Sequence, residues 1–274
     1  MSTEALRFEA VSKSFASAGR EPVPVVCDID IAVAHGESVA ILGPSGSGKS
    51  TILRLAAGLE TLTRSDLGTI RVSDHAPGAA GAKSALVFQA YSTFPWLTAE
   101  QNVMLALRQA GLPRAERRAA AGVKLASVRL TGLEKSFPAQ LSGGERQRLA
   151  FACAIALKPE LLLLDEPMGA LDPLTREHLQ LGLIRLWREQ RCAMVLVTHD
   201  ISEAVLLGQR VLLLSDRPGR IVLELCTSTG KPWLEAGHPP EALATMVRDY
   251  RGSAGFIELT NRLRDALADN EGQI

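Results

Sequence analysis

Residues 43–51 read GPSGSGKST, and this stretch decides how the rest of the chain is interpreted. An apolar run at 38–42 precedes it, and a segment of helical character at 52–57 follows it. A strand, a glycine loop and a helix in this order are the context that a phosphate-binding P-loop requires. Such a loop turns backbone N–H groups and a helix N-terminus toward an anion. A flexible glycine–serine turn is the alternative, and the two flanks make it less favourable.

The positions of this loop have separate expected roles. The glycines remove side chains, so that backbone N–H groups can face a phosphate. Lys49 is expected to reach the β- and γ-phosphates, and the Ser50 hydroxyl to ligate Mg²⁺. The residues predicted to bind the phosphates are Gly43, Ser45, Gly46, Gly48, Lys49, Ser50 and Thr51.

The composition of the 274 residues limits the class of protein. Thirty Lys and Arg residues balance thirty Asp and Glu residues, which argues against a broad electrostatic grip on nucleic acid or anionic lipid. Four scattered cysteines without a C-x-x-C pair indicate reduced thiols rather than a disulfide framework or a zinc site. We expect no signal peptide and no membrane span, so another chain would supply the membrane part of any membrane process.

The secondary-structure pattern changes along the chain. Residues 6–15 and 25–33 carry partly alternating apolar residues, which predicts two antiparallel strands. Phe15 ends the first strand and is either an exposed ring that stacks on adenine or an ordinary core or edge aromatic. Between 99 and 157, alanine, leucine and charged residues follow helical spacing, which predicts a helical lobe inserted into an α/β domain.

Polar residues follow three apolar strands. Residues 161–166 read LLLLDE, and a continuously apolar strand is typical of a parallel sheet whose ligands bind at the carboxyl ends of the strands. Adjacent residues point to opposite faces, so Asp165 is expected to hold Mg²⁺ and Glu166 to orient or deprotonate a water. A polar cap on a buried strand is the alternative. His199 is either a structural histidine or a donor to a γ-phosphate, and Gln89 either reaches a metal or water or is a turn residue.

Three further segments leave their interpretation open. Residues 141–148 read LSGGERQR, where Ser142 and Glu145 fit a capping box, and this helix start is either ordinary or faces a second phosphate. The aromatics of 91–97 form a docking surface if exposed and ordinary core if buried. Prolines and glycines predict a linker over 226–240, before an amphipathic helical tail.

Together these motifs resemble those of an ABC-type ATPase subunit over about residues 6–225. The motifs that carry the resemblance are GPSGSGKST, Gln89, residues 141–147, residues 161–166, Ala170-Leu171-Asp172 and His199, in that order. The stretch 94–98, FPWLT, and the turn 217–220, RPGR, resemble the nitrate, sulfonate and taurine importer branch.

The resemblance implies an α/β fold, specifically a P-loop NTPase with a mostly parallel core sheet, an N-terminal antiparallel β subdomain and an inserted helical lobe. The ATPase domain would span residues 1–225, with the lobe at about 90–157, and a linker and helical tail would occupy 226–274. The cofactors implied are ATP and Mg²⁺.

In this family two subunits pack head to tail with ATP in the interface. The resemblance therefore implies that Ser142, Gly143 and Gly144 of one copy cover phosphates bound by the loop of the other. Further implied roles are adenine stacking for Phe15, metal binding for Ser50 and Asp165, metal or water contact and partner sensing for Gln89, general base for Glu166, γ-phosphate and water contact for His199, and contact with the opposite subunit for Asp172.

The resemblance also implies partners and a location. Expected partners are a second copy of the chain, integral membrane permease subunits and a solute-binding protein, at the cytoplasmic face of the inner cell membrane. The transported solute is expected to be a small anion such as nitrate, sulfonate or taurine, and no nucleic acid is expected.

Three other functions are alternatives to an import ATPase. An exporter subunit is one. An ABC-type ATPase of nucleic acid or ribosomes fits poorly, because the chain has one P-loop and too few residues between Lys49 and Ser142 for a long coiled coil. A P-loop kinase would leave residues 141–147 and Glu166 unexplained.

Overall fold

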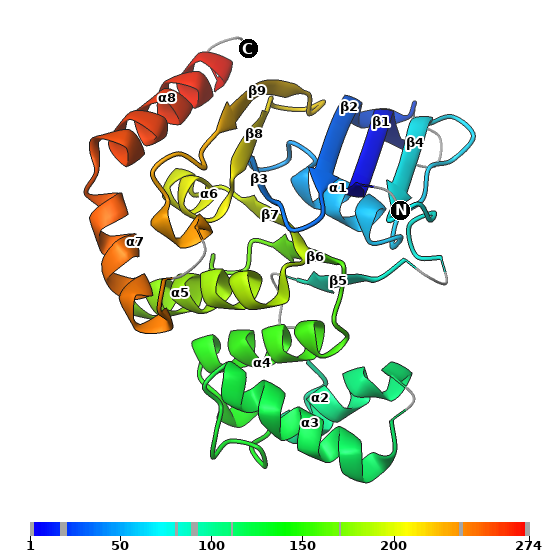
Figure 1. Ribbon diagram of the computed structural model, residues 1–274. Helices are drawn as coiled ribbons and strands as arrows, with labels where there is room; N and C mark the ends of the chain where they lie inside the picture. Colours follow the sequence, from blue (N-terminus) through cyan, green and yellow to red (C-terminus); the bar gives the residue numbers. More distant parts are fainter. Residues whose placement is uncertain are drawn as a thin grey trace.

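The protein is described from a computed structural model, which has two sheets side by side and a group of helices below them (Figure 1). The structure describes residues 3–16, 21–79, 82–88, 93–110, 112–169, 171–235 and 238–271.

The larger sheet has six strands in the order β5-β6-β7-β3-β8-β9. Their bounds are β3 Ser38–Leu42, β5 Ser84–Val87, β6 Leu161–Asp165, β7 Ala193–Thr198, β8 Arg210–Leu214 and β9 Ile221–Cys226. Five strands are parallel and β9 alone runs antiparallel to β8, its neighbour. Every residue of β3, β6 and β7 is buried, because structure covers both faces of the sheet. The predicted mostly parallel core sheet is confirmed.

The smaller sheet is antiparallel, in the order β2-β1-β4. Its strands are β1 Glu4–Phe15, β2 Val23–Ala34 and β4 Leu67–Val72. Apolar residues of this sheet share one buried cluster with helix α1, Lys49–Ala56, on one face of the larger sheet. The predicted N-terminal antiparallel subdomain is therefore present.

A second apolar cluster covers the opposite face of the larger sheet and continues into the helical lobe. The helices of this side are α2 Ala99–Ala106, η1 Leu107–Ala110, α3 Arg114–Ser127, η2 Pro138–Gln140, α4 Gly143–Ala156, α5 Pro173–Gln190 and α6 Ile201–Leu207. In Figure 1 α2, α3 and α4 form the lobe below the sheet, and α5 lies between α4 and the core. The predicted inserted helical lobe is therefore present.

The segment predicted as a linker packs against the core instead. Thr227 and Trp233 are buried, and the Thr227 hydroxyl donates to the Gly208 carbonyl at 2.6 Å. The Lys231 ammonium donates to the same carbonyl, and the Trp233 ring meets the Tyr250 ring edge-on at 5.2 Å. The prediction missed this because these anchors are separated by the prolines and glycines that suggested a loop.

The C-terminal tail consists of two helices. After the short turns η3, Pro232–Leu234, and η4, Pro240–Ala242, come α7, Leu243–Arg251, and α8, Ala254–Glu271. Within the described parts of the chain, every helix is too short or too polar to span a bilayer.

Candidate functional site

The glycine loop connects β3, in the centre of the larger sheet, to the first turn of α1. Gly46 and Gly48 adopt the left-handed region, with φ of 89° and 92°. A Cβ on Gly48 would lie 2.4 Å from Val26 Cγ1, so both the backbone angle and the space require glycine. Gly48 precedes α1 without a side-chain cap, which leaves the first N–H groups of the helix for a ligand.

Lys49 is the first residue of α1, and its side chain folds back along the loop. Its ammonium donates to the Gly43 carbonyl at 2.8 Å and to the Pro44 carbonyl at 2.6 Å. Burial lowers the pKa of Lys49, while the charges of Glu166 and Asp165 raise it. The loop therefore holds a desolvated cation between its own carbonyls and two acids.

The two acids at the end of β6 contact different groups, as their adjacency predicts. The Ser50 hydroxyl donates to Asp165 Oδ1 at 2.9 Å, whereas Glu166 Oε2 lies 3.2 Å from His199 Nδ1. Glu166 also has a φ of 42°, a conformation that costs free energy and is often found at functional sites. The structure thus brings Lys49, Ser50, Asp165, Glu166 and His199 together at the carboxyl ends of β3, β6 and β7.

The oxygens of Ser50 and Asp165 fit a magnesium ion. Mg²⁺ prefers hydroxyl, carboxylate and phosphate oxygens to nitrogen or sulfur ligands. Burial raises the pKa of Asp165, and the charge of Glu166 adds to this. A cation beside the carboxylate would offset both effects, so the donor set and its electrostatics agree with a magnesium ligand.

A hydrogen-bond network supports the segment that carries His199. The Asp200 N–H donates to Thr198 Oγ1 at 3.0 Å, and the Thr198 hydroxyl donates to the carboxyl group of Glu203. Arg176 donates to Asp200 Oδ2 at 3.3 Å and to the Leu171 carbonyl at 3.4 Å. Arg176 therefore links the residue before Asp172 to the residue after His199.

Sequence reasoning missed both Glu203 and Arg176. Glu203 lies three residues after Asp200, a spacing that suggests a helix cap, and the Glu203 N–H does donate to Asp200 Oδ1 at 3.0 Å. Its side chain, however, turns to Thr198. Arg176 gave no signal, because it resembles any charged residue on an amphipathic helix.

Residues 141–147, called the signature stretch below, contain the start of helix α4, as expected. Ser142 Oγ accepts from the Glu145 N–H at 3.3 Å, and Glu145 Oε2 accepts from the Ser142 N–H at 2.7 Å, which confirms the capping box. Ser142 is exposed, whereas Gly144 is buried, and a Cβ on Gly144 would lie 2.3 Å from Thr175 Cγ2. Gly144 therefore permits close packing of α4 on α5, in addition to any role toward a phosphate.

The signature stretch and the glycine loop lead into helices on opposite faces of the larger sheet. Residues of α4 belong to the apolar cluster on one face of the larger sheet, and residues of α1 belong to the cluster on the other face. Within one copy, the structure does not bring Ser142 to Lys49.

Other predicted residues are placed individually. Phe15 is 38% exposed, with the Lys13 ammonium 5.1 Å from its ring centroid. Asp172 caps α5 and accepts from the Thr175 N–H at 3.0 Å, which lowers the pKa of Asp172. Gln89 and Ala170 lie outside the described residues, so the roles of Gln89 toward metal, water and partner stay predictions.

Two aromatics of the stretch 91–97 are exposed, which favours the docking surface over ordinary core. Trp96 is 69% exposed and Phe94 is 45% exposed, with ring centroids 5.4 Å apart. Buried Asn102 fixes the loop, since its side chain accepts from the Phe94 N–H at 2.7 Å and donates to the carbonyls of Phe94, Leu97 and Thr98.

The turn at 217–220 contacts the glycine loop, which the sequence did not predict. A Cβ on Gly219 would lie 2.0 Å from the Ser47 carbonyl oxygen, and the Gly219 N–H donates to the Val25 carbonyl at 2.9 Å. Only glycine allows the turn to close on the loop this tightly.

Comparisons with known proteins identify the family. The family described as ABC transporter matches residues 26–169. A nitrate import ATP-binding protein of Synechocystis is 45% identical over 75% of this chain and 76% of its own length. A taurine import ATP-binding protein of Pseudomonas aeruginosa is 39% identical over 96% of this chain and 94% of its own length.

The solved structures agree in fold. The dimeric, post-hydrolysis ATP-binding cassette MJ0796, bound to ADP and phosphate, has a TM-score of 0.72 and 32% identity, covering 81% of this chain and 98% of that one. The chain belongs to the ABC transporter family. It is an ATPase subunit of that family, and the resemblance inferred from its motifs is confirmed.

Proposed function

We propose that this chain is the ATP-hydrolysing subunit of an import transporter for a small organic or inorganic anion. The observation that carries the proposal is the contact between Glu166 and His199 at the strand ends, beside the buried Lys49 and the Ser50–Asp165 pair. Phosphoryl transfer to water needs a general base, a cation that binds the phosphates and oxygen ligands for a metal ion, and these groups can supply all three.

Each group has one task in this reaction. The glycine loop and Lys49 bind the phosphates of ATP, and Glu166 takes the proton of the water that attacks the γ-phosphate. His199 orients the Glu166 carboxylate and donates to the γ-phosphate. Mg²⁺ held by Ser50 and Asp165 would neutralise phosphate charge.

The same proposal includes a second copy of the chain. Ser142 and Gly143 are accessible at the N-terminus of α4 but lie far in the fold from the glycine loop of their own copy, so a partner's nucleotide is the phosphate within their reach. The dimeric MJ0796 cassette supports this arrangement. ATP between two copies would make dimer closure depend on the γ-phosphate.

Transport requires a membrane protein, and the exposed Phe94–Trp96 pair is the surface we assign to it. Aromatic residues are enriched at protein interfaces, and Asn102 hydrogen-bonds to the backbone on both sides of Trp96. The chain would then lie at the cytoplasmic face of the membrane, and a solute-binding protein would deliver the solute to the permease. The nitrate and taurine import names of the relatives support an anion as the solute.

Affinity purification of the full chain from membranes of its own cells tests this function. We expect an integral membrane permease to copurify, and Trp96→Ala to reduce its recovery severalfold while the ATPase activity of the isolated chain is unchanged. Leu112→Ala, a change at another exposed apolar residue of the lobe, is the matched control. Equal recovery of the permease with Trp96→Ala would remove the docking assignment, and recovery of ribosomes or nucleic acid instead would remove the import function.

A further inference from the structure

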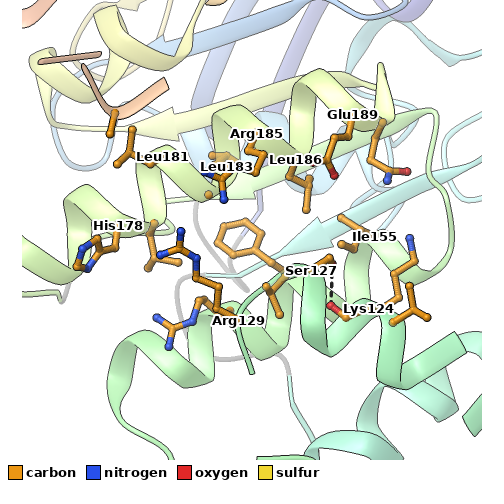
Figure 2. Close-up of a pocket in the computed structure, with 18 of the residues that line it drawn as sticks. Lys124, Ser127, Arg129, Ile155, His178, Leu181, Leu183, Arg185, Leu186 and Glu189 are labelled. Atoms are coloured by element: carbon orange, nitrogen blue, oxygen red, sulfur yellow. Dashed lines mark hydrogen bonds between the residues drawn. The ribbon is translucent and has the colours of Figure 1, made fainter. Parts of the chain in front are cut away.

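A cavity of about 920 Å³ lies between three parts of the chain, and no residue assigned to the nucleotide lines it (Figure 2). One wall comes from α3, the residues after it and α4, and the other from α5, with η4 and α7 at the margin. Its volume is in the range of about 300–1,000 Å³ that small-molecule sites occupy.

Cationic side chains enter the cavity from both walls. They are Lys124, Arg129 and Arg148 from the lobe, and Arg185 from α5. The acidic residues of the lining are Glu189 and Glu241. Among the residues that the structure describes, none of these four cationic groups forms an ion pair within 4.0 Å.

The charges are distributed unevenly along the cavity. Figure 2 shows Lys124 and Glu189 at one end, and Arg129 and His178 at the other. Burial lowers the pKa of Lys124, and the charge of Lys158 adds to this, while the charge of Glu189 opposes both, so Lys124 and Glu189 partly neutralise each other. The four cations outnumber the two acids of the lining, so the cavity keeps an excess of positive charge.

Two arginines in this excess are incompletely satisfied. Arg148 Nε and Arg185 Nε are buried and have no hydrogen-bond partner among the described residues. Burial lowers the pKa of Arg148, and the charge of Arg129 adds to this, while Glu145 opposes it. Both arginines line the cavity, one from each wall, so an anion between the walls would supply a counter-charge to both.

The rest of the lining is apolar. Phe151, Ile155 and Leu186 are buried side chains that face the cavity from α4 and α5. A small inorganic anion would leave this surface in contact with water, whereas a molecule with an acidic head and an apolar body would cover it.

We propose that this cavity binds an amphiphilic organic anion, with a sulfonate or carboxylate head between Arg148 and Arg185 and an apolar body along Phe151, Ile155 and Leu186. The two arginines belong to different walls, so a bound ligand would connect the lobe that carries the signature stretch to α5, the helix that Asp172 caps. The site is separate from the nucleotide site and from the exposed aromatic pair.

Isothermal titration of the full chain with octane-1-sulfonate tests the proposal. We expect saturable binding at one site, with no comparable binding of sulfate, which lacks the apolar body, or of 1-octanol, which lacks the charge. Arg148→Met and Arg185→Met should each weaken binding at least about tenfold, because each removes a charged hydrogen-bond donor. Arg118→Met is the matched control, since Arg118 lies on α3, pairs with Glu100 and does not line the cavity.

A second variant keeps the test decisive if an arginine variant fails to fold. Gly182 lines the cavity, and a Cβ added to it would meet nothing within 4 Å. Gly182→Phe should therefore fold, occupy the apolar part and abolish binding of octane-1-sulfonate. Binding that is unchanged in Gly182→Phe and in the folded arginine variants, or equal binding of 1-octanol, would overturn the proposal.

Discussion

Helices α1 and α4 both begin at a serine- and glycine-rich run, yet the first backbone N–H groups of the two helices differ in their hydrogen-bond partners. Helix α1 follows Gly48 without a side-chain cap, and its first residue is the buried Lys49. Helix α4 is capped by its own Ser142 and Glu145, at an exposed position. We therefore expect the start of α1 to bind phosphate with groups of its own chain, and the start of α4 to act on the nucleotide of a second copy.

The base beside the α1 site gives the largest expected effect. Glu166→Gln keeps the side-chain shape and removes the proton acceptor, so ATP hydrolysis should fall by about 10²–10⁴-fold while ATP binding is retained. Phosphate release, ATP titration and light scattering check this, and the last should reveal a dimer that persists with ATP.

Glu177→Gln on α5 is the control and should hydrolyse ATP normally. A Glu166→Gln protein with ordinary turnover would show that the acid in contact with His199 is not the base, and the α1 site would then be a binding site alone.

Mixing two inactive variants tests the other half of the comparison. Lys49→Ala damages the α1 site and Ser142→Arg damages the α4 surface, so each variant alone should be nearly inactive. A mixed dimer has one doubly damaged site and one intact site if the α4 surface acts on the partner's nucleotide. Part of the wild-type ATPase activity should therefore return on mixing, as measured by phosphate release.

Each variant mixed with itself is the control. Absence of recovery, with mixed dimers demonstrated by two different tags, would mean that Ser142 acts within its own chain or only maintains the helix.

The same contrast explains what the sequence could predict. The α1 site could be predicted because its parts are adjacent in the sequence: the strand, the glycine loop, Lys49 and Ser50 follow one another. The two acids at the end of β6 likewise directly follow an apolar run. The sequence also predicted the sheets and the lobe, because their apolar periods differ. The packing of Gly144 on Thr175 was not predictable, because a glycine in a sequence looks the same whether it faces a ligand or a neighbouring helix.

Contacts between distant segments account for most of the rest. Arg176 reaches Asp200, Gly219 reaches Ser47, and Lys231 reaches Gly208, and none of these pairs lies within one motif. Each depends on the fold that joins the segments. The cavity between the lobe and α5 belongs to this group, since its charges come from separate helices.

The support of His199 gives the smallest expected effect, and it concerns pH. Glu203 is buried beside Thr198, and burial raises the pKa of Glu203 from 4.5 to about 7. The charges of Asp200 and Glu166 also raise this pKa, whereas the charge of Arg176 lowers it. The folded state therefore keeps a proton that the unfolded state has lost between these values. The contribution of Glu203 to stability is complete below about pH 4.5 and is lost as the pH rises through about 7.

Glu203→Gln should remove this dependence, because glutamine can still accept from the Thr198 hydroxyl and does not titrate. Denaturant unfolding at pH 5 and pH 8 measures it: the wild-type protein should lose more stability between the two than the variant does. A pKa difference of one unit corresponds to about 1.4 kcal/mol, so the difference should be on the order of 1–3 kcal/mol. Glu258→Gln, at an exposed position of α8, should behave as wild type. Parallel pH profiles for wild type and Glu203→Gln would mean that Glu203 is ionised in the folded state, and that the strand end with His199 carries one more negative charge than the network described above.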